Sequence, residues 1–139
     1  MTLYVLDTDM LTLLEEGHPA VGRRFLQERL EDTAITVLSV EEQLSGWYTE
    51  VRKAKRPERL AWAYRRLADT ISFLARLQIL TYDEQAMQRY EQLRKAKIKI
   101  GRMDLRIAAV VLEHGAVLVT RNARDFKKVP GLQIEDWSA

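Results

Sequence analysis

Short apolar runs alternate with longer segments of helical periodicity along the whole chain, and this alternation restricts the possible folds severely. Runs typical of buried strands occupy residues 2–6 (TLYVL), 34–38 (AITVL), 77–82 (LQILTY), 116–120 (AVLVT) and 132–134. The intervening segments repeat apolar residues every three or four positions, as Leu60, Tyr64, Leu67 and Ile71 do. Alternating strands and helices predict an α/β fold with a mostly parallel central sheet of four to five strands, flanked by helices on both faces.

Capping residues set the expected helix boundaries. Helices are predicted over about 10–17, 19–32, 40–54, 57–77, 83–97 and 102–114, with a short turn or helix over 124–129. Asp9, Ser39 and Asp83 are the expected N-caps of the helices that follow them. Pro19 and Pro57 stand at first-turn positions, where the missing N–H of proline costs nothing.

The length and composition predict one domain over residues 1–139 and exclude several classes of protein. The longest apolar run, Ile107 to Leu112, has six residues, which is too short to span a bilayer. No signal peptide is recognisable, and no cysteine is present, so disulfides, thiol nucleophiles and cysteine-bound zinc are excluded. We therefore expect a cytoplasmic protein with no membrane contact.

The net charge of +2 conceals a strong asymmetry along the chain. Residues 1–50 carry three Lys/Arg and ten Asp/Glu, whereas residues 51–106 carry fifteen and six. The basic middle segment has two clusters of cations that could follow an RNA backbone by salt-dependent phosphate contacts. These are Arg52, Lys53, Lys55 and Arg56, with Arg59 beside them, and Arg94, Lys95, Lys97, Lys99 and Arg102. The alternative is two solvated faces of opposite charge that pair with each other.

Acidic residues follow the predicted strands. Asp7 ends the first strand, Glu41 and Glu42 follow the second, and Asp125 follows the strand at 116–120. The carboxyl ends of parallel strands share one edge of the sheet, where α/β proteins bind ligands, so these acids should converge. Asp104 would have to reach the same place from the start of the helix over 102–114.

Clustered carboxylates repel one another unless a cation lies between them. An oxygen-only donor set suits Mg²⁺ or Mn²⁺, which activate water for attack on phosphate esters. Each acid also has a structural alternative as a helix cap or solvated group, and Asp7 has the fewest. Trp47, Tyr48, Trp62 and Tyr64 could stack on bases, or could fill the core or a subunit interface.

The ordered motifs of the chain resemble PIN-domain endoribonucleases of the VapC toxin type. The matching segments are YVLDTDML, ITVLSVEEQLSG, IGRMDLRIAAVVLEHG, VLVTRNARDF and PGLQIEDWS, which together extend over almost the whole sequence. The resemblance implies a PIN-type three-layer sandwich. It also implies a metal-dependent endoribonuclease that leaves 3′-hydroxyl and 5′-phosphate ends, acting as the toxin of a type II toxin–antitoxin pair.

The resemblance assigns roles to individual residues. The catalytic acids would be Asp7, Glu42, Asp104 and Asp125, with Asp7 and Asp104 binding Mg²⁺ or Mn²⁺ directly; Thr120 and Asn122 would orient water or a carboxylate. Glu42 is preferred over Glu41 because it stands four residues before Gly46, as in the ExxxG arrangement of the family. Many relatives have Asn where this chain has Asp9; we expect Asp9 to cap a helix, with a role at the metal as the alternative.

The resemblance also implies partners. A VapB-like antitoxin would wrap the toxin and insert a basic side chain into the acidic pocket. The substrate would be RNA, and the toxin would form a homodimer, alone or within a larger toxin–antitoxin assembly.

Two other functions fit part of the sequence. Asp7-Thr8-Asp9 after a strand is similar to the motif of haloacid-dehalogenase-type phosphatases, although Leu11 departs from that pattern and TRNARDF offers no suitable lysine. A non-catalytic module could instead use the acidic pocket to bind an arginine of a partner protein.

Overall fold

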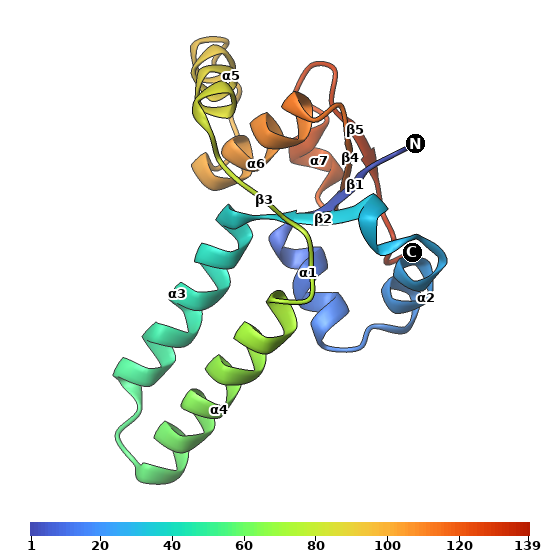
Figure 1. Ribbon diagram of the computed structural model, residues 1–139. Helices are drawn as coiled ribbons and strands as arrows, with labels where there is room; N and C mark the ends of the chain where they lie inside the picture. Colours follow the sequence, from blue (N-terminus) through green and yellow to red (C-terminus); the bar gives the residue numbers. More distant parts are fainter.

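A five-stranded parallel sheet forms the centre of the computed structural model, which describes all 139 residues (Figure 1). The strands are β1 (Tyr4–Leu6), β2 (Thr33–Thr36), β3 (Ile79–Leu80), β4 (Val117–Val119) and β5 (Gln133–Glu135). Their order across the sheet is β3-β2-β1-β4-β5, and every neighbouring pair is parallel. The predicted α/β architecture and strand number are therefore confirmed.

Seven α-helices connect and cover the strands. They are α1 (Thr8–Glu15), α2 (Pro19–Gln27), α3 (Val37–Lys53), α4 (Pro57–Leu74), α5 (Glu84–Lys95), α6 (Arg102–Glu113) and α7 (Ala123–Phe126). The prediction for α2 was too long, because the backbone becomes extended at Glu28 and a separate 3₁₀ turn follows at Leu30–Asp32.

Successive strand residues pack on opposite faces of the sheet, which makes a three-layer sandwich. In β1, Val5 packs into a core of sixteen buried residues with α6, whereas Leu6 packs into a second core of eight with α1 and α2. Leu118 and Val119 divide between the same two cores. This two-residue alternation explains why both faces of the sheet are apolar.

Two of the three predicted N-caps are wrong, because both helices begin closer to the preceding strand than expected. Asp7, not Asp9, caps α1, and Thr36, not Ser39, caps α3. Both capping residues have extended backbone, so each strand passes directly into the next helix. Asp83 caps α5 as predicted.

We expect Thr36→Ala to lower the free energy of unfolding by about 1 kcal/mol, because it removes the cap of α3. Thr36 is fully buried, and its hydroxyl oxygen accepts a hydrogen bond from the Ser39 N–H at 3.2 Å. Urea denaturation measures the change. Thr49→Ala in the same helix is the control, since its hydroxyl is exposed and should change stability by less than about 0.5 kcal/mol. Equal stability of Thr36→Ala and the wild type would contradict the assignment of this cap.

The helices after β2 and β3 form two projections. α3 and α4 pack as an antiparallel hairpin that extends away from the sheet, while α5 packs on α6 at the opposite end of the view (Figure 1). Among these helices none combines the length and apolar character that a membrane span requires.

Candidate active site

The sheet topology brings the ends of β1 and β4 together. The chain passes from β1 outward through β2 to β3, and then returns to the other side of β1 for β4 and β5. Asp7 directly follows β1, and its N–H donates to the Val119 carbonyl of β4 at 3.0 Å. Open parallel sheets bind their ligands at such a reversal of strand order, outside the carboxyl ends of the strands.

Asp7 is a nearly buried carboxylate, with 5% of its surface exposed. Its Oδ1 accepts a hydrogen bond from the Met10 N–H at 2.8 Å, so it has a structural role that the sequence did not suggest. Burial raises the pKa of Asp7 to about 6, and the charges of Asp9 and Asp104 add to this, against hydrogen bonds from Thr120 and Met10. At neutral pH the fold therefore holds a poorly solvated negative charge at the end of β1.

Asp104 reaches the same edge of the sheet from a helix. α6 leads into β4 and runs back across the sheet, so its first turn lies at the carboxyl ends of the strands. Burial raises the pKa of Asp104, and the charges of Glu42 and Asp125 raise it further. Together with the effect of Asp104 on Asp7, these shifts relate the charges of the four predicted acids to one another, and Asp104 and Glu42 line one hollow.

Glu42 is held by a residue that sequence reasoning missed. Its Oε1 accepts a hydrogen bond from the Thr8 hydroxyl at 2.5 Å, and the same hydroxyl lies 2.8 Å from the Ser39 Oγ. Thr8 directly follows Asp7 and Ser39 lies one turn before Glu42, so their closeness to the acids was the available signal. Glu41 is exposed and has no such contact.

Asp125 is positioned by residues of the segment after β4. The Asn122 side-chain amide donates to Asp125 Oδ2 at 3.1 Å, and the Lys128 ammonium lies 3.6 Å from Oδ1. The Asn122 hydrogen bond, with the charges of Lys128 and Arg124, lowers the pKa of Asp125. The Thr120 hydroxyl accepts a hydrogen bond from the Asn122 N–H at 2.9 Å. Thr120 also hydrogen-bonds to Asp7, so Thr120 and Asn122 each contact one acid of the cluster and contact each other.

Asp9 is paired with an arginine that follows the neighbouring strand β4. Both of its carboxylate oxygens accept from Arg121, at 2.8 and 3.2 Å. Both side chains are largely exposed, and the pair lies beside Asp7. Asp9 thus balances Arg121, and the expectation that it caps α1 is wrong.

The acidic side chains do not form a closed metal site in the structure. No three acidic or histidine side chains converge closely enough to form a complete metal cage. Mg²⁺ typically takes one or two carboxylates and completes its shell with water and phosphate oxygens. His18 and His114 are engaged elsewhere, at the N-cap of α2 and at the Val110 carbonyl.

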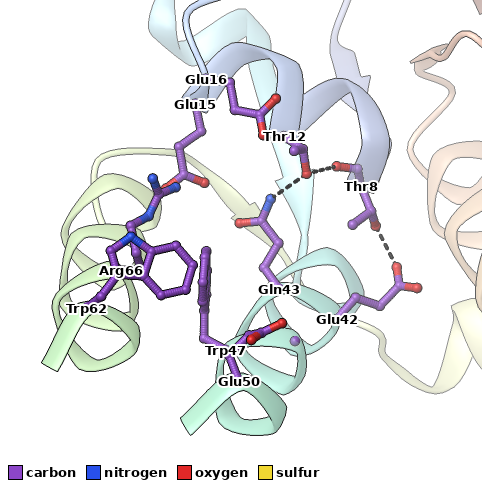
Figure 2. Close-up of a pocket in the computed structure, with 11 residues that line it drawn as sticks. Thr8, Thr12, Glu15, Glu16, Glu42, Gln43, Trp47, Glu50, Trp62 and Arg66 are labelled. Carbon is purple, nitrogen blue, oxygen red and sulfur yellow. Dashed lines mark hydrogen bonds between the residues drawn. The ribbon is translucent and has the colours of Figure 1, made fainter. Parts of the chain in front are cut away.

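A pocket of about 380 Å³ opens beside the acids, between α1, α3 and α4 (Figure 2). It shares Thr8 and Glu42 with the acid cluster. Trp47 and Trp62 form its wall, edge to face with ring centres 5.5 Å apart. Arg66 lies over the Trp47 ring, so packing of the α3–α4 hairpin explains these aromatic residues better than base stacking does.

The structure does not bring the two basic clusters together. The first lies at the tip of the α3–α4 hairpin and the second at the connection from α5 to α6, at separate places in the fold (Figure 1). Arg94 is paired with Glu91 at 2.8 Å and Arg59 with Glu50 at 3.4 Å, whereas the other cations of the two clusters form no ion pair. Of the second cluster, Arg102 lies nearest to the acids, in one hollow with Asp104 and Glu42.

Comparison with known proteins gives consistent results. The PIN domain family model matches residues 4–132. The tRNA(fMet)-specific endonuclease VapC of Salmonella typhimurium is 30% identical over 99% of both chains, and ribonuclease VapC2 of Rickettsia felis is 28% identical over 97% of this chain and 98% of the relative.

Solved structures agree with this result. DNA-bound VapBC from Salmonella typhimurium matches with a TM-score of 0.80 and 30% identity over 99% of both chains. VapBC2 from Rickettsia felis bound to a promoter DNA fragment matches with a TM-score of 0.76 and 27% identity, over 98% of this chain and 99% of that one.

Proposed function

The chain belongs to the VapC family of PIN-domain proteins, and from this premise we propose that it is the ribonuclease toxin of a toxin–antitoxin pair. The observation that carries the proposal is the placement of the acids: Asp7 ends β1 beside β4, and Asp104 and Glu42 line one hollow. Two relatives that align over almost their full length are named as a ribonuclease and a tRNA endonuclease. We propose that residues 1–139 act as one PIN domain.

Asp7 and Asp104 would bind Mg²⁺ or Mn²⁺. Bound in this way, such an ion polarises a phosphoryl oxygen and lowers the pKa of a coordinated water. The Asp7 carboxylate is buried and its pKa is raised. A bound cation would therefore offset the free-energy cost of its ionisation. Thr120 would keep that carboxylate in a single orientation.

Glu42 and Asp125 would orient the attacking water. Thr8 holds the Glu42 carboxylate and Asn122 holds that of Asp125, so neither needs to reorganise when substrate binds. In the proposed reaction the water oxygen bonds to phosphorus, the bond from phosphorus to the 3′-oxygen breaks, and that oxygen takes up a proton. The products would carry 3′-hydroxyl and 5′-phosphate ends.

The test is incubation of the purified protein with total RNA and with a tRNA(fMet) transcript, with Mg²⁺, with Mn²⁺ or with EDTA. We expect internal cuts with either metal and none with EDTA, and ligation of an adaptor to the new 5′-phosphates maps them. Cleavage in EDTA would contradict the metal-dependent mechanism. Hydrolysis of an aryl phosphate without RNA cleavage would favour the phosphatase alternative.

We also propose a VapB-like antitoxin as partner, with homodimers of the toxin. The similar solved structures from Salmonella typhimurium and Rickettsia felis are VapBC complexes bound to DNA. Co-expression with a VapB-like protein should give a complex without ribonuclease activity. Light scattering of the toxin alone and of the complex measures both assemblies.

We expect Asp9→Asn to retain RNA cleavage, because both Asp9 oxygens already accept from Arg121. The exposed ion pair would be lost, so binding of RNA could change through Arg121, but metal-dependent cleavage should persist. Initial rates with the tRNA(fMet) transcript measure the effect against the wild type. Loss of cleavage in Asp9→Asn as complete as in Asp7→Asn would place Asp9 in the metal site instead.

A further inference from the structure

Arg106 is a half-buried arginine beside the acid cluster whose charge has no carboxylate partner. It lies two residues after Asp104 on α6 and lines a hollow of about 550 Å³ together with Asp104, Glu42 and Arg102. Its Nε is buried without an acceptor, Nη1 donates to the Met103 sulfur at 3.9 Å, and the side chain also hydrogen-bonds to Tyr82. A guanidinium has five N–H donors, so this one has unused hydrogen-bonding capacity next to the acids.

Two tyrosines hold the Arg106 guanidinium in place. Its central carbon lies 5.4 Å from the centre of the Tyr90 ring and 5.8 Å from that of Tyr82. Burial raises the pKa of the Tyr82 hydroxyl, while the charge of Arg106 and a hydrogen bond from its side chain act in the opposite direction. The two rings fix the position of the guanidinium by packing before any ligand binds.

The neighbouring cation points to an extended anion. Arg102 lies one helical turn before Arg106, on the same side of α6, and it also forms no ion pair. Like charges at this spacing destabilise a helix, so a folded protein gains nothing from the pair. Lys97 and Lys99 precede Arg102 in the connection from α5, so this stretch of the chain carries further positive charge.

We propose that Arg106 binds a phosphate of the RNA strand adjacent to the cleaved bond, and so positions that strand beside Asp104 and Glu42. This inference rests on the proposed ribonuclease function and identifies one contact of its substrate. Arginine is suited to the role because its planar fork donates two parallel hydrogen bonds to phosphate oxygens. The strand would continue past Arg102 towards the α5–α6 connection.

The first test is equilibrium binding of a fluorescent tRNA(fMet) transcript in EDTA, where cleavage is not expected. Arg106→Gln should weaken binding by roughly tenfold, as expected for loss of one charge-assisted contact, and should reduce the salt dependence by about one phosphate. Arg106→Lys should recover part of the affinity. Arg89→Gln is the matched control, because it removes an α5 cation that is already paired with Glu113 at 2.9 Å.

The second test changes the RNA instead of the protein. Transcripts ethylated at random phosphates are separated into bound and free fractions, which shows which phosphates the protein needs. Transcripts ethylated at a phosphate next to the mapped cleavage site should be depleted from the fraction bound by the wild type and by Arg106→Lys. They should not be depleted from the fraction bound by Arg106→Gln. This readout remains valid even if thermal denaturation shows Arg106→Gln to be less stable than the wild type.

The outcomes separate the two proposals. Unchanged affinity, salt dependence and ethylation pattern in Arg106→Gln, with a wild type that cleaves RNA, would overturn the role of Arg106 and leave the proposed function intact. A wild type that neither binds nor cleaves RNA would overturn both. An equal loss in Arg106→Gln and Arg89→Gln would show a general effect of charge and would also overturn the specific contact.

Discussion

Replacing Asp7 with asparagine is expected to abolish RNA cleavage and, without metal, to raise the free energy of unfolding by up to about 3 kcal/mol at pH 7. Cleavage should be lost because asparagine removes one of the two proposed metal ligands. Stability should rise because folding buries the Asp7 charge, moving its pKa from 3.8 to about 6. Asparagine keeps an oxygen that can accept from the Met10 N–H, so the cap of α1 is retained.

The gain in stability should depend on pH in a defined way. A carboxyl with a higher pKa in the folded chain than in the unfolded chain binds more protons when folded, so folding loses stability as the pH rises between these values. For Asp7 this loss begins near 3.8 and is complete above about 6. The free energy of unfolding of Asp7→Asn should therefore equal that of the wild type near pH 4 and exceed it most at pH 7. Urea denaturation in the presence of EDTA measures this difference.

Asp125→Asn is the control for this stability effect. The pKa of Asp125 is lowered by its hydrogen bond from Asn122, so loss of its charge should give no gain at pH 7. If Asp7→Asn were less stable than the wild type at pH 7 and still cleaved RNA, Asp7 would be a helix cap only.

Asp104→Asn is expected to abolish cleavage and also the stabilisation that Mg²⁺ gives to the folded protein. A ligand that binds only the folded state stabilises it by about 2.7 kcal/mol at one hundred times its dissociation constant. The wild type should therefore melt at a higher temperature with Mg²⁺, whereas Asp104→Asn should not respond. Differential scanning calorimetry with and without Mg²⁺ measures this difference.

The affinity of the wild type for Mg²⁺ should fall roughly tenfold between pH 7 and pH 5, because the metal must displace the proton of Asp7, whose pKa is about 6.

Glu41→Gln is the matched control for Asp104→Asn, since it removes one exposed carboxylate near the site. It should keep both cleavage and the response to Mg²⁺. An Asp104→Asn protein that is still stabilised by Mg²⁺ as the wild type is would rule out Asp104 as a ligand.

Much of the fold was predictable because buried positions are apolar, and their spacing along the sequence differs between strands and helices. Strands covered on both faces must be apolar at successive positions, as Val5 and Leu6 are, and amphipathic helices must repeat every three to four residues. The helix starts were less predictable. Asp7 and Asp9 are equally suitable N-caps by residue type. Asp7 is the N-cap because α1 begins directly after β1 ends.

The candidate site was predictable to the extent that it follows from topology. Asp7 and Asp125 stand just after strands, and parallel strands must bring their carboxyl ends to one edge. Asp104 was less certain, since its place depends on α6 beginning at that same edge. The contacts of Thr8 with Glu42 and of Arg121 with Asp9 join positions far apart in the chain, the second pair 112 residues apart, and no local pattern encodes them.

The sequence by itself therefore determined the order of strands and helices along the chain, the parallel sheet and the candidate acids that follow its strands, because these depend on periodicity and on residue type. Tertiary structure alone decided the electrostatic state of each acid. Burial raises the pKa of Asp7, Arg121 balances Asp9, and Asn122 with Lys128 lowers the pKa of Asp125. Solvation and charge pairing depend on which groups surround a side chain in space, and these groups come from distant segments of the chain.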